Sequence, residues 1–115
     1  MSILKKLNEV VIFDLEATCE DKLVDFYYDK ETIEIGAVKI KGTEIIDEFN
    51  TFIQPKDTSI TPFCTELTTI TAADVNNAPL FHEASNAFGS FIGNAYILSW
   101  GDTANNCSRI LPDTI

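Results

Sequence analysis

The sequence predicts an α/β domain built around a mixed sheet, in which an antiparallel meander of three strands is joined by a parallel fourth strand and packed with helices. Three observations support this fold class. Short apolar runs of strand type come first, separated by connections short enough for antiparallel pairing. A segment with apolar residues at helical spacing follows, and then one more apolar run. All of this lies within 115 residues, the size of one domain.

The first strand is expected at residues 9–15, where the apolar stretch Val10–Phe13 runs into two acidic residues, Asp14 and Glu16. Side chains alternate along a strand, so these two carboxylates point to the same face. Two like charges on one face repel each other, and burying them without a partner is costly. The pair therefore predicts a site for something positively charged.

The second and third strands are expected at residues 32–40 and 44–55, with Lys41–Thr43 as the turn between them. The alternation within the second strand places Ile33 and Ile35 on the same face. Because the connections are short, these two strands and the first are expected to form an antiparallel meander.

Two helices are expected downstream of the meander. Thr71 is placed to cap a short helix over Ala72–Asn76, and Pro79 fits near the start of a longer one. The longer helix is expected to end at Gly93, and its apolar stripe consists of Phe81, Ala84, Phe88, Phe91 and Ile92. The expected layout is one domain over 1–115, with a strand meander over 9–54, helices over 66–93 and a last strand over 95–102.

The last apolar run, "AYILSW", ends in Gly101-Asp102, so an acidic residue again follows a strand. Ligand sites in α/β sheets gather at the carboxyl ends of parallel strands, where Asp14, Glu16 and Asp102 would meet. Carboxylate oxygens are hard ligands suited to Mg²⁺ or Mn²⁺. The structural alternatives are a solvated strand end for the first two residues and a turn aspartate for Asp102.

Charge and composition narrow the functional classes. The formal net charge of −10 argues against binding nucleic acid over a broad basic surface, because that binding depends on neutralising phosphates. A carboxylate pocket that holds divalent metals can still present a local positive site. No apolar run is long enough to span a membrane and no signal-peptide pattern opens the chain, so we expect a cytoplasmic protein. Cys19, Cys64 and Cys107 form no C-x-x-C motif and are expected to be free structural thiols.

Four segments together resemble one family of nucleases. The stretch "VIFDLEATC" resembles the first motif, D-x-E-A-T-C, of the DEDDh 3′-to-5′ exonucleases, and especially of the Eri-type and sporulation-inhibitor-type exoribonucleases. "ETIEIGAVKI" resembles the second strand of that family, and "FIQPKDTSITPFCTELTTITAADVNNAPLF" resembles its long segment around F-C-T-E-L-T. "ILSWGD" resembles the strand that carries the second exonuclease motif. The match runs in order over residues 9–102, and the F-C-T-E-L-T segment makes it specific.

This resemblance implies a ribonuclease H-like fold, two divalent metal ions (Mg²⁺ or Mn²⁺) and stepwise hydrolysis of single-stranded nucleic acid from a 3′ end, with RNA preferred to DNA. Asp14 would bridge both metals, Glu16 would complete one site and orient the attacking water, and Asp102 would bind the second metal. The product would be a nucleoside 5′-monophosphate. The residues implied in the pocket for the terminal nucleotide are Leu15, Ala17, Thr18, Cys64 and Leu67.

The sequence departs from the family pattern at the third motif, H-x-x-x-x-D, which supplies a general base and the last metal ligand. His82, the only histidine, precedes the second motif and is interpreted as an exposed helix residue. The domain is therefore expected to be C-terminally incomplete: a piece of a longer protein, the product of a truncated gene, or a short form completed by another chain. Exposed apolar surface on the incomplete sheet would favour a homo-oligomer. The second hypothesis for function is a catalytically inactive domain that binds nucleic acid, nucleotide or a protein partner.

Overall fold

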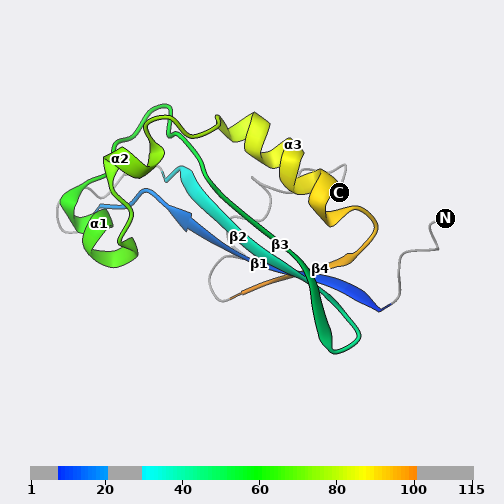
Figure 1. Cartoon of the computed structure of the whole chain (residues 1–115). Coiled ribbons are helices and arrows are strands. Elements are labelled where there is room, and N and C mark those ends of the chain that lie inside the picture. The colour runs from blue at the N-terminus through cyan, green and yellow to red at the C-terminus, as the bar shows by residue number, and fades with distance from the viewer. Residues whose placement is uncertain (1–7, 21–29, 101–115) are drawn as a thin grey trace.

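The computed structural model describes residues 8–20 and 30–100, and the elements below are confined to them (Figure 1). They are β1 (Glu9–Ala17), β2 (Thr32–Lys41), β3 (Glu44–Phe52), α1 (Pro62–Thr68), α2 (Ala72–Val75), α3 (Phe81–Ile92) and β4 (Tyr96–Ser99). The expected strands and both expected helices are present, and α1 is an additional element. None of the helices in these two ranges has the length and apolarity that crossing a membrane requires.

The four strands form one mixed sheet in the order β3-β2-β1-β4. β1 pairs antiparallel with β2, and β2 with β3, whereas β4 runs parallel to β1 with Val10 opposite Tyr96. The turn between β2 and β3 uses Gly42 at φ +64°, a conformation that glycine adopts without steric cost. The predicted meander and the parallel fourth strand are both confirmed. β1 and β4 therefore run in the same direction, and their carboxyl ends point toward the same end of the sheet.

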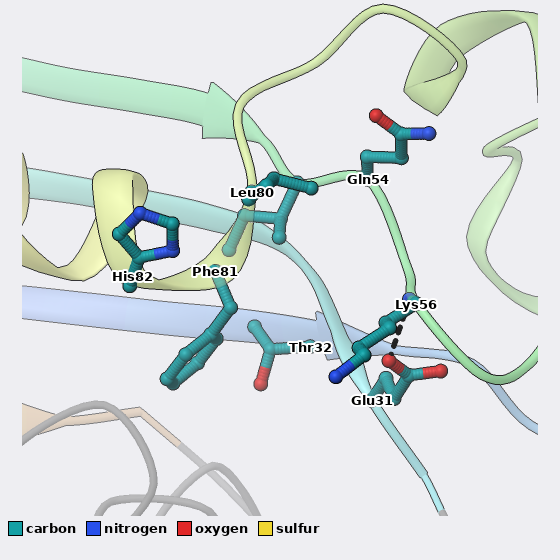
Figure 2. Close-up of a pocket in the computed structure, with 8 residues that line it drawn as sticks. Glu31, Thr32, Gln54, Lys56, Leu80, Phe81 and His82 are labelled. Carbon is teal, nitrogen blue, oxygen red and sulfur yellow. Dashed lines mark hydrogen bonds between the residues drawn. The ribbon is translucent and has the colours of Figure 1, made fainter.

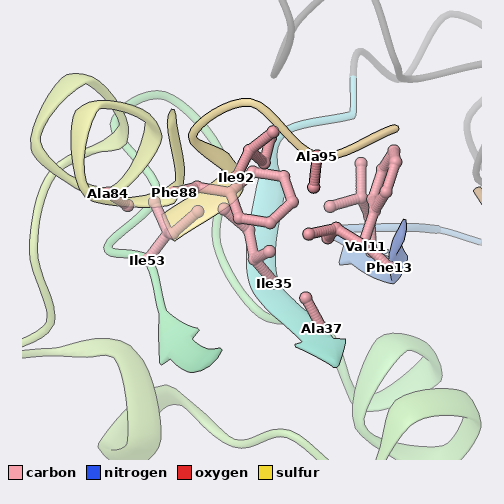
Figure 3. Packing of buried hydrophobic residues seen from close by; sticks show 10 residues of the cluster. Val11, Phe13, Ile35, Ala37, Ile53, Ala84, Phe88, Ile92 and Ala95 are labelled. Carbon is pink, nitrogen blue, oxygen red and sulfur yellow. The ribbon is translucent and has the colours of Figure 1, made fainter. Parts of the chain in front are cut away.

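The main core lies on one face of the sheet, beneath α3 (Figures 1 and 3). Phe88 of α3 is fully buried at its centre, and its ring centroid is 5.5 Å from that of Phe13 and 5.5 Å from that of Phe49. Of the stripe predicted for α3, Ala84, Phe88 and Ile92 are buried in this cluster and Phe91 packs against it, whereas Phe81, at the start of the helix, is 37% exposed. The buried members of the cluster are Val11, Phe13, Leu15, Ile35, Ala37, Ile53, Ala84, Phe88, Ile92 and Ala95.

A second core cluster lies at the end of the sheet where α1 and α2 pack. Ile33 packs there with Cys64, Ile70 and Val75, in a cluster separate from that of Ile35. The β1–β2 ladder is irregular beside this cluster: Glu16 pairs with Glu34, but Ala17 pairs with Thr32, so Ile33 is an extra residue in β2. Ile33 and Ile35 are both buried, with the half-buried Glu34 between them, as the alternation predicts.

The additional helix, α1, begins and ends with local signals. The Thr61 hydroxyl accepts a hydrogen bond of 3.0 Å from the Cys64 N–H, and Pro62 occupies the first helical position. The helix ends at Thr69, which adopts a left-handed conformation with φ +67°. The T-P pair was a usable start signal, but the stretch is only two turns long and shows little apolar periodicity.

Candidate functional site

β1 carries the carboxylate pair on the face opposite the main core. Val11, Phe13 and Leu15 are buried beneath α3, so the alternating residues Asp14 and Glu16 point to the other face. The Asp14 side chain is exposed and the Glu16 side chain is half-buried. The structure therefore places both predicted ligands from the first strand on one face near its carboxyl end.

The neighbouring strands complete the surroundings of this pair. Gly36 of β2 lies opposite Asp14, and Glu34 lies opposite Glu16. One strand further, Asn50 pairs with Gly36, and its side-chain amide donates a hydrogen bond of 3.2 Å to the Glu34 carboxylate. Glycine leaves the space beside Asp14 without a side chain, and Asn50 holds Glu34 next to it. Glu34 was not among the predicted site residues, because its position opposite Glu16 depends on how β1 pairs with β2.

The electrostatics of this face favour a cation. Burial raises the pKa of Glu16, and the nearby charges of Asp14 and Glu34 raise it further. A divalent ion would relieve this repulsion, and carboxylate oxygens are the ligands that Mg²⁺ and Mn²⁺ prefer. The donor chemistry of Asp14 and Glu16 therefore fits part of a hard-metal site.

The third predicted ligand, Asp102, lies outside the described residues. Over residues 8–20 and 30–100, the structure brings together no group of three His, Cys, Asp or Glu side chains that could hold a metal ion. β4 ends at Ser99 beside Phe13 of β1, and the Trp100 N–H donates to the Phe13 carbonyl at 2.9 Å. Trp100, the last described residue before Asp102, therefore lies beside β1 at the carboxyl end of β4.

Two residues predicted to line a nucleotide pocket, Thr18 and Cys64, are fully buried. The Thr18 hydroxyl accepts a hydrogen bond of 2.9 Å from the Glu31 N–H. The Cys64 thiol lies 3.6 Å from the Ala17 carbonyl, to which it donates. In this conformation both side chains are engaged inside the protein, so they support the chain next to Glu16 without being open to a ligand.

A second hydrogen bond joins the segment after Glu16 to α1, at the residue that caps the helix. The Thr61 hydroxyl donates a hydrogen bond of 2.7 Å to the Cys19 carbonyl. Burial and the adjacent Cys64 thiol raise the pKa of Cys19 to about 11. Both cysteines are free, as predicted, and the Cys19 thiol stays protonated at neutral pH, as in a structural cysteine.

The remaining predicted pocket residues differ in exposure. Leu15 faces the core, so only its backbone can contribute to a site, and Ala17 is half-buried. Leu67 on α1 is 64% exposed and is the one member of this group with an open apolar side chain. Trp100, directly after β4, is 67% exposed. Exposed apolar side chains are thus present on α1 and directly after β4.

A pocket of about 730 Å³ lies at the start of α3, away from the carboxylates (Figure 2). Its apolar walls are Leu80, Phe81 and Ile53. His82 also lines it and is exposed there, as the sequence predicted. Because α3 covers the face opposite Asp14, this pocket belongs to the other side of the sheet. It forms no part of the carboxylate site.

Comparisons with known proteins agree on one family. A family model described as exonuclease, RNase_T, matches residues 11–101. The PolC-type DNA polymerase III of Clostridium perfringens is 41% identical over 92 residues, which make up 80% of this chain and 6% of that protein. The 3′-5′ exonuclease eri1 of Schizosaccharomyces pombe is 34% identical over 80 residues, or 67% of this chain and 27% of that protein.

A solved structure shows the same arrangement. The nuclease domain of 3′hExo, a DEDDh family member bound to rAMP, matches with a TM-score of 0.78 at 26% identity, covering 91% of this chain and 58% of that one. The predicted ribonuclease H-like fold class is therefore confirmed. The chain spans less than a third of the length of the curated relatives named above. The PolC-type relative has the higher identity, so similarity alone does not single out the Eri-type branch.

Proposed function

Because this chain belongs to the DEDDh family of 3′-to-5′ exonucleases, we propose that it is a metal-dependent exonuclease domain that shortens single-stranded nucleic acid from the 3′ end. Its products would be nucleoside 5′-monophosphates. The observation that carries this proposal is the pair Asp14 and Glu16, which lie on one face of β1 at the sheet edge shared with β4. The raised pKa of Glu16 supports it, because that carboxylate is held where a nearby cation would stabilise its charge.

In the proposed reaction, Asp14 and Glu16 would hold two Mg²⁺ or Mn²⁺ ions together with Asp102. Such ions, when bound, lower the pKa of a water molecule and stabilise charge on the phosphate. Asp14 is exposed and would contact the ions from the solvent side, whereas the half-buried Glu16 would orient the water. Glu34 is held by Asn50 and adds negative charge next to Glu16, which strengthens the attraction for cations.

We propose RNA in preference to DNA. Two solved structures support this preference: that of 3′hExo bound to rAMP, and one of a 3′-exonuclease, 28% identical, that recognises a histone mRNA stem-loop. The terminal base would contact exposed apolar side chains such as Leu67, since stacking and apolar contact tolerate any base. The backbone of Leu15 and Ala17 would line the floor of this pocket beside the carboxylates.

The test is digestion of 5′-labelled single-stranded RNA, and of DNA of the same sequence, with Mn²⁺, Mg²⁺ or a chelator. Because residues 1–115 contain no third motif, and loss of its general base costs about 10²- to 10⁴-fold in rate, we expect only a faint metal-dependent ladder of shortened RNA, and slower shortening of DNA. Asp14→Asn, which keeps the size of the side chain, should abolish the ladder and weaken Mn²⁺ binding. Glu44→Gln is the matched control, because it removes one exposed carboxylate from β3. A ladder that persists in Asp14→Asn would refute the assignment of Asp14.

The alternative is a domain that binds nucleic acid, nucleotide or a protein partner without hydrolysis. One observation favours it: His82, the only histidine, lies at the start of α3 on the side of the sheet away from Asp14. It is therefore not placed to act as general base for the carboxylate site, and loss of such a base costs about 10²- to 10⁴-fold in rate. Mn²⁺ binding by a folded chain that produces no ladder would support this alternative.

We also propose that a second copy of the chain covers apolar surface around β4. Leu98 is 58% exposed and Trp100 is 67% exposed, and both adjoin an edge of the described sheet. The expected result is a dimer in light scattering that Leu98→Lys converts to monomer. A wild-type chain that is monomeric at high micromolar concentration would refute it.

A further inference from the structure

The carboxylate of Glu31, the residue before β2, has an unusually complete set of hydrogen bonds. It accepts bonds from three consecutive backbone N–H groups, those of Lys56 at 2.7 Å, Asp57 at 2.9 Å and Thr58 at 2.6 Å. The Thr58 hydroxyl donates a fourth, at 2.6 Å. Figure 2 shows the bond from the Lys56 N–H. Burial alone would raise the pKa of Glu31, but these hydrogen bonds outweigh it and lower the pKa, so the ionised side chain holds residues 56–58 in place.

The backbone of Glu31 is joined to the chain just after the carboxylate pair. The Thr18 N–H donates to the Glu31 carbonyl at 2.7 Å, and the Glu31 N–H donates to the Thr18 hydroxyl at 2.9 Å. The Thr18 and Thr58 hydroxyls are 3.0 Å apart and share a further hydrogen bond. Glu31 therefore connects the end of β1, the start of β2 and the turn after β3 in one network.

This network fixes the middle of a segment whose two ends are fixed by α1. Thr18 comes two residues after Glu16 and is fully buried. On either side of it, the carbonyl of Ala17 accepts from the Cys64 thiol, and the carbonyl of Cys19 accepts from the Thr61 hydroxyl. Residues 17–19 are thus held in position from two directions, directly beside the carboxylate face of β1.

We propose that Glu31 is a positioning residue, which fixes segment 17–19 relative to α1 and thereby shapes the wall of the nucleotide pocket beside Glu16. The nucleotide part of this inference rests on the proposed function. Glu31 acts through Thr18 and Thr58 and does not contact the substrate. Its loss is expected to weaken nucleotide binding and to leave metal binding at Asp14 and Glu16 unchanged.

Hydrogen exchange and ligand binding together test this role. Glu31→Ala removes the carboxylate, and Thr58→Val removes the bridging hydroxyl in case the first variant fails to fold. Thr58→Ser, which keeps the hydroxyl, and Glu44→Gln, which removes an exposed carboxylate elsewhere, are the controls. In the first two variants we expect the amides of Thr18 and of residues 56–58 to exchange about 10- to 100-fold faster, with the β1 amides of Val11 and Phe13 unchanged.

The binding measurement separates positioning from general stabilisation. With Mn²⁺ present, AMP should bind about tenfold more weakly to Glu31→Ala and Thr58→Val, while the affinity for Mn²⁺ alone stays that of the wild type. Thr58→Ser, which keeps the hydroxyl, should bind AMP as the wild type does. Unchanged exchange at Thr18, or faster exchange throughout β1 and β2, would overturn the proposal, as would a parallel loss of Mn²⁺ affinity. If the wild-type chain binds Mn²⁺ but no AMP, the proposed nucleotide pocket is wrong, and the exchange data alone decide whether Glu31 fixes segment 17–19.

Discussion

The end of α1 offers a substitution that should stabilise the protein. Thr69 lies in the left-handed region at φ +67°, where its N–H donates to the Thr65 carbonyl at 2.8 Å. A residue with a Cβ atom is strained in this conformation by about 1–2 kcal/mol, and a β-branched residue is among the least suited to it. Glycine would keep the N–H and remove the strain. We therefore expect Thr69→Gly to stabilise the fold.

The magnitude follows from two opposing terms. Relief of strain contributes about 1–2 kcal/mol, whereas the greater freedom of glycine in the unfolded chain costs about 0.5–1 kcal/mol. The Thr69 side chain is exposed, so little packing is lost. The net gain in the free energy of unfolding is about 0.5–1 kcal/mol, which corresponds to a rise in Tm of about 2–6 °C.

Urea denaturation measures this gain as a shift of the midpoint at constant slope. Thr69→Ala is the matched control, because alanine removes the β-branch but retains a Cβ atom, and it should stay within about 0.5 kcal/mol of the wild type. A Thr69→Gly variant that is no more stable than Thr69→Ala would refute the reasoning. The left-handed conformation would then carry no strain at this helix end.

Three further predictions concern the core and the carboxylates. Phe88→Ala should cost about 3–5 kcal/mol in urea denaturation, because it empties the centre of the cluster beneath α3, and Phe88→Leu should cost much less. The lowered pKa of Glu31 adds stability that is fully present above its unfolded pKa and is lost as pH falls through the lower folded value. Glu31→Gln should therefore flatten the acid limb of the stability curve, and an unchanged limb would contradict the network. The pKa shift of Glu16 has the opposite effect on stability, because a raised carboxyl pKa makes the folded state less stable as pH rises. Removing its neighbour's charge with Asp14→Asn should stabilise the metal-free protein at pH 7 in thermal denaturation, and a lower Tm would contradict it.

The elements that could be predicted from the sequence are those with a clear period. The stripe on α3 and its end at Gly93 follow from helical spacing and a glycine C-cap, and both are present. The shared face of Asp14 and Glu16 follows from the alternation of a strand. These features depend on residues close in sequence, so local pattern was enough to predict them.

The features that could not be predicted depend on contacts between distant segments. Ile33 is an extra residue in β2, between Thr32 opposite Ala17 and Glu34 opposite Glu16, which only the pairing of the two strands reveals. The Glu31 network joins residues 25 to 27 positions apart. The burial of the Thr18 and Cys64 side chains, and their hydrogen bonds to Glu31 and Ala17, likewise depend on segments distant in sequence.

The acidic residues of the first motif and the three residues that follow them therefore have different physical roles. In D-x-E-A-T-C, the carboxylates of Asp14 and Glu16 face away from the core, whereas the last three residues are joined to α1 and Glu31 by internal hydrogen bonds. Cys64 of the F-C-T segment supplies one partner of that internal set and Thr61, just before the segment, supplies another, so these two residues serve the fold. Under the proposed mechanism, a relative could keep the scaffold residues and lose hydrolysis by losing Asp14. The Asp14→Asn digestion experiment therefore tests the proposed role of this carboxylate without disturbing the scaffold.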